Sequence, residues 1–223
     1  MGRGVKIAVA VIIGLVVVAV GYFAIGRPIQ VLPRIQTTIP FEMSDQNGDL
    51  YRYPDRARPM NLYVVVATWD DEAVARAEQM LERVYAELRE QENIDELLEI
   101  AWISPDPAND DIESLRAASA RIPILQATGA PLLTAAPTVV RLAVGAGMGI
   151  YVSPPAEGQT RVAYEPGLVL VDNVGYVRGR YSLNEADERR LVRDLPLLVA
   201  EVTAEGSEKA LYEAAHLFLC YPR

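Results

Sequence analysis

The sequence contains a single cysteine and a single histidine, Cys220 and His216, which stand four residues apart near the C-terminus. On a helix these two side chains would share one face, and with a nearby methionine they could hold copper(I). The tail from Ala214 to Tyr221 is largely apolar, however, and a buried cysteine often packs as a small hydrophobic residue. Because two ligands do not complete a metal site, we predict no metal centre here.

The same scarcity restricts the covalent chemistry that the chain can perform. One thiol cannot form an internal disulfide or a CxxC pair, so a redox enzyme would need a second cysteine from a partner chain. A serine or cysteine hydrolase would need His216 beside its nucleophile. We therefore predict a protein that is not an enzyme, with no catalytic residue and no cofactor.

Acidic residues form two clusters that could together surround a hard cation such as calcium. The clusters are Asp70, Asp71 and Glu72, and Asp106, Asp110 and Asp111. Each cluster also precedes or begins an expected helix, where the helix dipole favours negative charge. We favour this second interpretation and predict no metal site at these residues.

The elements that would position these residues alternate between strands and helices. Short apolar runs predict strands at 62–67, 100–103 and 168–171, and the last of these continues through a turn into a hairpin partner at 176–181. Apolar spacing and capping residues predict helices at 68–90, 112–120, 184–202 and 208–219. This order is that of a thioredoxin-like α/β sandwich. Residues 121–160 give no clear prediction, and their glycines do not form a dinucleotide-binding loop.

The N-terminal residues favour a membrane anchor. The run from Ile7 to Ile25 is apolar and long enough to cross a bilayer, which exceeds the usual apolar core of a cleaved signal peptide. Arg3 and Lys6 precede it, so the N-terminus is expected in the cytoplasm and the rest outside the membrane. We therefore predict an anchor at 1–27, an extended proline-containing tether at 28–40, and one α/β domain at 41–223.

Four short motifs, in order along the chain, resemble those of the SCO/SenC family. They are Phe41 to Gly48 (an opening hairpin with D-x-x-G), Ile103 to Asp110 (I-S-x-D-P-x-x-D), Gln126 to Gly129 (near an L-T-G), and Leu170 to Gly175 (L-x-D-x-x-G). The resemblance covers residues 38 to about 200. It implies a thioredoxin-like fold and an origin among copper chaperones of respiratory oxidases.

The resemblance also places the copper ligands that this family uses. The family binds copper through a C-x-x-x-C pair after the first core strand and through a histidine before the later hairpin. In this sequence those three positions fall at Asp70, Val74 and Tyr164. Copper(I) prefers sulfur and imidazole, which none of these residues supplies. Tyr164 and Trp69 are expected near the former metal pocket, where they either fill the space or bind a small ligand or partner.

From these observations we expect a non-catalytic accessory subunit of a membrane electron-transport complex. The resemblance suggests a terminal oxidase or an alternative complex III type quinol-oxidising complex as host, with the domain on the periplasmic side of the inner membrane. The alternative is a transient assembly factor or a copper chaperone with unconventional ligands. The net charge of -9 argues against nucleic acid as a partner, and it could attract a basic soluble electron carrier.

Overall fold

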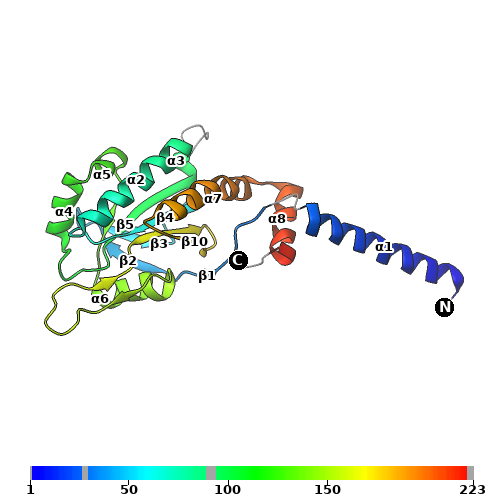
Figure 1. Ribbon diagram of the computed structural model, residues 1–223, viewed down its shortest axis with the longest axis horizontal. Coiled ribbons are helices and arrows are strands. Elements are labelled where there is room, and N and C mark those ends of the chain that lie inside the picture. The colour runs from blue at the N-terminus through cyan, green and yellow to red at the C-terminus, as the bar shows by residue number, and fades with distance from the viewer. Residues whose placement is uncertain (1, 27–29, 89–93, 220–223) are drawn as a thin grey trace. The chain divides into compact units, whose positions relative to one another are not determined.

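The computed structural model describes residues 2–26, 30–88 and 94–219 of the chain (Figure 1). These residues belong to two compact units. The larger unit is Leu32–Thr203, and the smaller one comprises the described parts of 1–31 and 204–223. All strands in the described part of the chain lie in the larger unit.

A six-stranded mixed sheet forms the centre of the larger unit (Figure 1). Its order is β1 (Gln36–Thr37), β10 (Tyr176–Ser182), β9 (Gly167–Asp172), β4 (Met60–Val65), β5 (Leu98–Ile103) and β6 (Leu132–Leu133). The pairs β4–β5 and β5–β6 are parallel, whereas β4–β9, β9–β10 and β10–β1 are antiparallel. This is the thioredoxin-like arrangement predicted from the order of elements.

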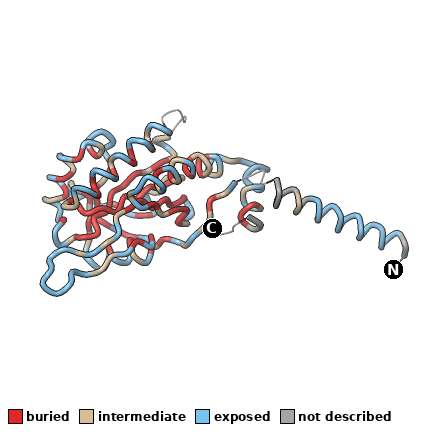
Figure 2. Tube along the Cα trace, viewed as in Figure 1, coloured by how far each residue is buried: buried red, intermediate tan, exposed pale blue. Residues whose placement is uncertain are grey.

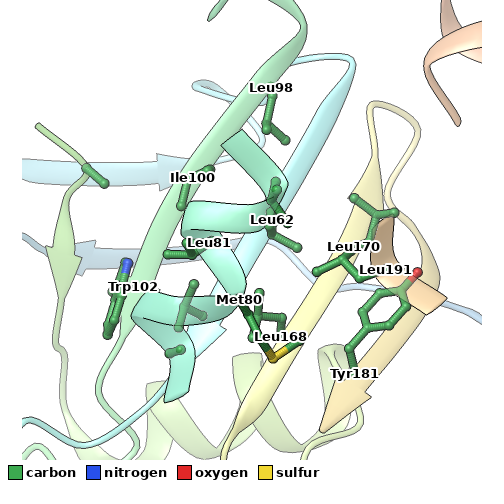
Figure 3. Close-up of a cluster of buried hydrophobic side chains, with 14 of the residues drawn as sticks. Leu62, Met80, Leu81, Leu98, Ile100, Trp102, Leu168, Leu170, Tyr181 and Leu191 are labelled. Carbon is green, nitrogen blue, oxygen red and sulfur yellow. The ribbon is translucent and has the colours of Figure 1, made fainter. Parts of the chain in front are cut away.

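Helices cover one face of the sheet and bury one set of alternate strand residues. These helices are α2 (Asp71–Leu88), α3 (Ile94–Leu97), α4 (Ile112–Arg121), α5 (Pro123–Thr128) and α7 (Glu185–Thr203). Leu62 of β4 and Leu168 of β9 pack in the same cluster as Met80 and Leu81 of α2 and Leu191 of α7 (Figure 3). The apolar stripe predicted for α2 therefore faces the core, as helical spacing requires.

The opposite face has a second core, built from the residues that alternate with the first set. Tyr63 and Val169 face this side and pack against the hairpin of β2 and β3 and against Val140 and Met148. Its covering elements are β2 (Phe41–Ser44), β3 (Leu50–Tyr53), α6 (Pro137–Val140) and the π-helix η1 (Arg141–Gly147). A small hairpin, β7 (Val152–Ser153) and β8 (Ala163–Tyr164), follows. Because both faces are covered, burial runs along the central strands (Figure 2).

Two helix starts carry the caps that the sequence predicts. The Asp111 carboxylate accepts a hydrogen bond from the Ser114 amide at 2.8 Å, and α4 begins at the next residue. The Asn184 side chain accepts from the amides of Ala186 and Asp187 before α7. These bonds satisfy amides that have no partner within the helix.

The predicted tether at 28–40 is wrong for residues 32–40, which belong to the sheet domain. Leu32 is buried in the helical-side core, and β1 pairs with β10 through Gln36 opposite Val177. The exposed edge of β10 offers unpaired backbone groups, and a short adjacent strand satisfies them. The compact unit therefore begins at residue 32 instead of 41, and it ends at Thr203.

The smaller unit contains two helices, α1 (Arg3–Gly26) and α8 (Gly206–Leu219). Both were predicted as helical from the sequence. Among the residues that the structure describes, no helix is long and apolar enough to cross a membrane. The membrane anchor stays a prediction from the sequence.

Candidate functional site

The candidate site lies where β4 and β5 end, at the carboxyl edge of the sheet. The loop after β4 carries Thr68, Trp69 and Asp70 into α2, and the loop after β5 carries Ser104 to Asp110 into α4. Thr68 and Trp69, which were predicted as the first residues of a helix, form a turn before it. Loops at this edge of a sheet are a common place for functional residues.

Asp70 and Tyr164, which occupy two of the three inferred ligand positions, are in direct contact. The Tyr164 hydroxyl donates a hydrogen bond to Asp70 Oδ2 at 2.8 Å, and the Ala67 amide donates to the same hydroxyl at 3.2 Å. Asp70 Oδ1 accepts from the Ala73 amide at 3.2 Å, so this carboxylate also caps the start of α2. The structure thus joins the two positions by a hydrogen bond between oxygen atoms.

Val74, at the third position, is buried in the core on the helical side of the sheet. It lies in the first turns of α2, and its amide donates to the Asp70 carbonyl at 2.9 Å. An aliphatic side chain has no donor atom for a metal, and burial here contributes to packing.

The protonated state of Tyr164 maintains its hydrogen bond to Asp70. Burial raises the pKa of Tyr164, and its hydrogen bond to Asp70 and the charge of that carboxylate raise it further. The phenol therefore stays protonated at neutral pH and can continue to donate to Asp70.

Asp110 links the loop after β4 to the loop after β5 through hydrogen bonds. It is buried, and it accepts hydrogen bonds from the Thr68 amide at 2.9 Å, the Thr68 hydroxyl at 2.5 Å and the Ser104 hydroxyl at 2.5 Å. Three donors compensate the burial of a carboxylate. Asp110 is therefore a bracing residue and has no oxygen left in an open position.

Trp69 forms the outer wall of the site. Its indole nitrogen donates to Asp106 Oδ2 at 3.0 Å, and its ring meets the Tyr164 ring edge to face with centroids 6.0 Å apart. The guanidinium of Arg161 lies over the indole, 4.3 Å from the ring centroid. Asn109 donates to Asp106 Oδ2 at 2.8 Å and to the Thr160 carbonyl at 2.9 Å, so the segment before β8 is fastened to the loop after β5.

The acidic clusters do not form the cation site that was considered from the sequence. Asp71 pairs with Arg121 at 2.7 Å, Asp111 caps α4, and Glu72 is exposed. In the part of the chain that the structure describes, no group of three or more histidine, cysteine, aspartate or glutamate residues is placed to hold a metal ion. The acids are dispersed because each has its own local partner or faces solvent.

The alternative copper pair is only partly within the described residues. His216 lies on α8 and is buried. Cys220 lies outside the described residues, so the pairing of these two stays untested. The four methionines of the larger unit, Met43, Met60, Met80 and Met148, are buried in its two cores.

Several residues of the network were not predicted in the roles that they have here. Asp110 was considered only as part of a cation site, and Ser104 was not singled out. Both belong to the motif that follows the second core strand, so the resemblance contained a signal for them. Asn109 and Arg161 were missed because they act across a long irregular loop that has no periodicity. As a whole the arrangement offers hydrogen bonding and packing.

The fold is shared with solved SCO structures. No protein-family model matches the sequence, and no curated protein does. BsSco, described as a member of the Sco family of cytochrome c oxidase assembly proteins, matches with a TM-score of 0.62 and 19% identity over 79% of this chain and 99% of its own. Apo Sco1 from Thermus thermophilus matches with a TM-score of 0.57 and 20% identity over 74% and 93% of the two chains. ScoI from Bradyrhizobium japonicum with copper bound matches with a TM-score of 0.55 and 16% identity over 73% and 98%. These likenesses confirm the fold that the four motifs predict.

Proposed function

We propose that this protein is a member of the SCO/SenC family without the copper site, and that it serves as a non-catalytic accessory subunit of a membrane electron-transport complex. The observation that carries the proposal is the hydrogen bond between Tyr164 and Asp70. These residues occupy inferred ligand positions and are bonded to each other.

The chemistry of the three positions opposes copper(I) binding. Copper(I) is held by thiolate, thioether and imidazole ligands, whereas a carboxylate and a phenol offer oxygen and Val74 offers nothing. A metal at this place would also have to break the bond between Tyr164 and Asp70 and remove a capping group from α2. What is left is a braced loop pair that presents Trp69 and Arg161 on a fixed scaffold.

The proposed host complex follows from what is described for a protein of similar fold. BsSco is described as belonging to a family of cytochrome c oxidase assembly proteins, and this chain shares its fold. We infer that the host is a terminal oxidase or an alternative complex III type quinol-oxidising complex. In such a complex a metal-free domain would act in assembly, in stability, or in docking an electron carrier.

The proposal includes the location expected from the sequence. Residues 7–25 would anchor the protein in the inner membrane with Arg3 and Lys6 on the cytoplasmic side, and the sheet domain would lie in the periplasm. This part rests on the amino-acid sequence alone. Alkaline extraction of native membranes tests it: retention in the pellet supports an anchor, and release into the supernatant contradicts it.

The experiment that tests the function is extraction of native membranes with mild detergent, followed by native-gel separation and mass spectrometry of the band. We expect stoichiometric migration with electron-transfer subunits that carry haem, copper or iron–sulfur groups. Migration alone, or only with partners present during biogenesis, would contradict a stable subunit and favour the transient assembly factor.

A copper titration of the purified full-length protein distinguishes a copper-free subunit from a copper chaperone. The protein is titrated with copper(I) in competition with a chromogenic chelator. Binding weaker than micromolar agrees with the proposal. Tighter binding would overturn the copper-free function and return the chain to copper delivery, and Cys220→Ser would then show whether the C-terminal thiol is a ligand.

A further inference from the structure

A polar pocket of about 470 Å³ opens at the opposite end of the sheet from the Asp70–Tyr164 pair. Its walls come from the turn between β2 and β3, the loop between β3 and β4, the start of β5, and the segment before β6. Glu99 stands near the beginning of β5, opposite Asn61, whereas the first site lies beyond the other end of the same strand. The pocket is therefore separate from the site considered above, and what it binds does not depend on the proposed function.

Several hydrogen-bond donors line these walls. Arg56 is exposed and has no ion-pair partner among the described residues, and its guanidinium lies 5.7 Å from the centre of the Tyr51 ring. Gln46 accepts a hydrogen bond from the Leu132 amide at 2.8 Å through its side-chain oxygen, which leaves its amide group as a donor. Asp45 accepts from the amides of Asn47 and Asp49, both through Oδ1.

Glu99 is the acid that faces these donors. Its side chain is only 19% exposed, and its nearest cationic atom, Arg58 Nε, is 3.5 Å away, beyond a normal hydrogen bond. Burial raises the pKa of Glu99, and the charges of Arg58 and Arg56 offset part of that rise. A carboxyl in this position is more easily protonated than a solvated one, and in that state it becomes a further donor.

Two buried phenols stand behind Glu99. The side chains of Tyr51 and Tyr63 are almost fully buried, and neither hydroxyl makes a well-formed hydrogen bond within the described residues. Burial raises the pKa of Tyr51 to about 12 and raises that of Tyr63 as well. The interaction between the two hydroxyls lowers the pKa of Tyr51 and raises that of Tyr63, and the nearby Glu99 carboxylate raises both. Buried hydroxyls that lack well-formed hydrogen bonds are uncommon in proteins and mark a place where polar groups are incompletely satisfied.

We propose that this pocket binds one small oxyanion, a carboxylate or a phosphate-like group, between the guanidinium groups of Arg56 and Arg58. Arginine binds such planar or tetrahedral oxygen groups through paired N–H donors. The main chain of Arg58 is held by two hydrogen bonds to the Asn61 side chain, which fixes the point from which its guanidinium reaches the pocket. A bound anion would draw Arg58 from Glu99, and protonation of Glu99 removes the competing negative charge.

Anion binding in this pocket should depend on the protonation of Glu99. The charged residues that line the pocket with Glu99 are Asp45, Arg56 and Arg58, and the phenols of Tyr51 and Tyr63 lie behind it. The arginines keep their charge and the phenols stay neutral over the ordinary pH range. Glu99 is therefore the group that changes, and anion affinity should fall as the pH rises through its pKa.

The test is equilibrium dialysis of the purified full-length protein against radiolabelled sulfate, whose charge is constant between about pH 5 and pH 8. We expect one saturable site per chain, weaker at the higher pH. Arg56→Gln should lower the affinity by about tenfold, which is the value of one charge-assisted hydrogen bond. Arg76→Gln is the matched control, because Arg76 is an exposed arginine on α2 away from the pocket, and it should leave the affinity unchanged.

Glu99→Gln distinguishes a binding role from a structural one. This variant keeps the shape of the side chain and its neutral state, so it should retain sulfate binding and lose the pH dependence. Displacement of sulfate by formate at lower concentration than by phosphate identifies a carboxylate as the preferred ligand, and the reverse identifies a phosphate group. Absence of saturable binding, or equal binding by Arg56→Gln and the unchanged protein, would overturn the proposal.

Discussion

The Tyr164 hydroxyl links two segments that are 94 residues apart in the sequence, through Asp70 Oδ2 and the Ala67 amide. Replacing Tyr164 with phenylalanine removes this oxygen and leaves the ring against Trp69. We expect the free energy of unfolding to fall by about 1 kcal/mol, the usual net value of such a hydrogen bond. Urea unfolding of the full-length protein measures it.

Tyr151→Phe is the matched control for this change. Tyr151 is 56% exposed, and its loss of one hydroxyl should alter stability by less than about 0.5 kcal/mol. If Tyr164→Phe proves as stable as this control, the bond between Tyr164 and Asp70 contributes nothing and the site is not closed in the way we describe.

Restoring the ligand types at the three positions provides a gain-of-function test. In the variant Asp70→Cys, Val74→Cys and Tyr164→His, the first and third side chains start from positions already in contact, and the second lies one helical turn after the first. We expect copper(I) binding tighter than micromolar, because two thiolates and an imidazole suit this ion. The measurement is the same chelator competition that is used for the unchanged protein.

The two-site variant Asp70→Cys and Tyr164→His, with Val74 kept, is the control for that test. It supplies one sulfur fewer and should bind more weakly. A folded triple variant that binds no better than the unchanged protein would show that these positions do not correspond to the ligand positions of copper-binding SCO proteins.

At the scale of elements, a buried arginine joins the hairpin of β9 and β10 to α7 and to the chain before β1. The Arg178 guanidinium donates to Asp172 Oδ2 at 2.9 Å, to Glu201 Oε2 at 2.6 Å, and to the Leu32 carbonyl at 2.8 Å. Asp172 also accepts from three backbone amides of the hairpin turn through its other oxygen. This group fixes three elements at one corner of the sheet.

Arg178→Met should therefore be strongly destabilising. It leaves two buried carboxylates without their cation, and breaking one partner of a buried ion pair costs about 3–5 kcal/mol. Arg52→Met is the control, because Arg52 pairs with Glu42 on the surface and the pair contributes about 1 kcal/mol or less. Urea unfolding compares the two, and equal midpoints would refute the bracing role of Arg178.

The elements also show what sequence reasoning can and cannot reach. The strands β4 and β9 were predicted from short apolar runs, β10 from the turn that follows β9, and the helix α2 from its apolar residues at helical spacing. The strand β1 was missed because two residues among prolines carry no periodic signal. The π-helix η1 was missed because its terminal carbonyls, at Ala146 and Gly147, are satisfied by Gln36, a contact made 110 or more residues away.

The candidate site was also predicted only in part. The resemblance placed Asp70, Val74 and Tyr164 at one pocket, and the structure brings Asp70 and Tyr164 together. The resemblance could not reveal that these two side chains are hydrogen-bonded to each other, because hydrogen bonds between distant segments depend on the packing of the whole sheet. The oxyanion pocket gave no signal, since its walls come from four separate segments without a shared motif.

At the scale of the whole molecule, the thioredoxin-like scaffold holds its loops in place through hydrogen bonds and packing at the three inferred ligand positions. Asp70 caps α2, Val74 fills the core, and Tyr164 bridges to the loop after β4. Each residue at an inferred ligand position thus makes a contact that stabilises the fold.

The tyrosines of the larger unit predict how its stability depends on pH. The chain has 11 tyrosines, and burial raises the pKa of five of them in the folded protein: Tyr51, Tyr53, Tyr63, Tyr164 and Tyr181. For Tyr51 and Tyr53 the pKa reaches about 12. In the unfolded chain all of them ionise near pH 10. The stabilisation from neutral buried phenols is therefore fully present below about pH 10 and is lost as the pH rises through the folded values.

We therefore expect alkaline unfolding that is coupled to tyrosine ionisation. The ultraviolet absorbance of tyrosinate should rise in two stages, first for exposed tyrosines near pH 10 and then for buried ones together with the loss of the near-ultraviolet circular dichroism of the fold. Because Tyr51 and Tyr63 lie on one side of the sheet and Tyr181 on the other, the second stage reports on both cores at once. A single stage near pH 10 with the circular dichroism unchanged would mean that solvent reaches these phenols, and the two-sided core described here would be wrong.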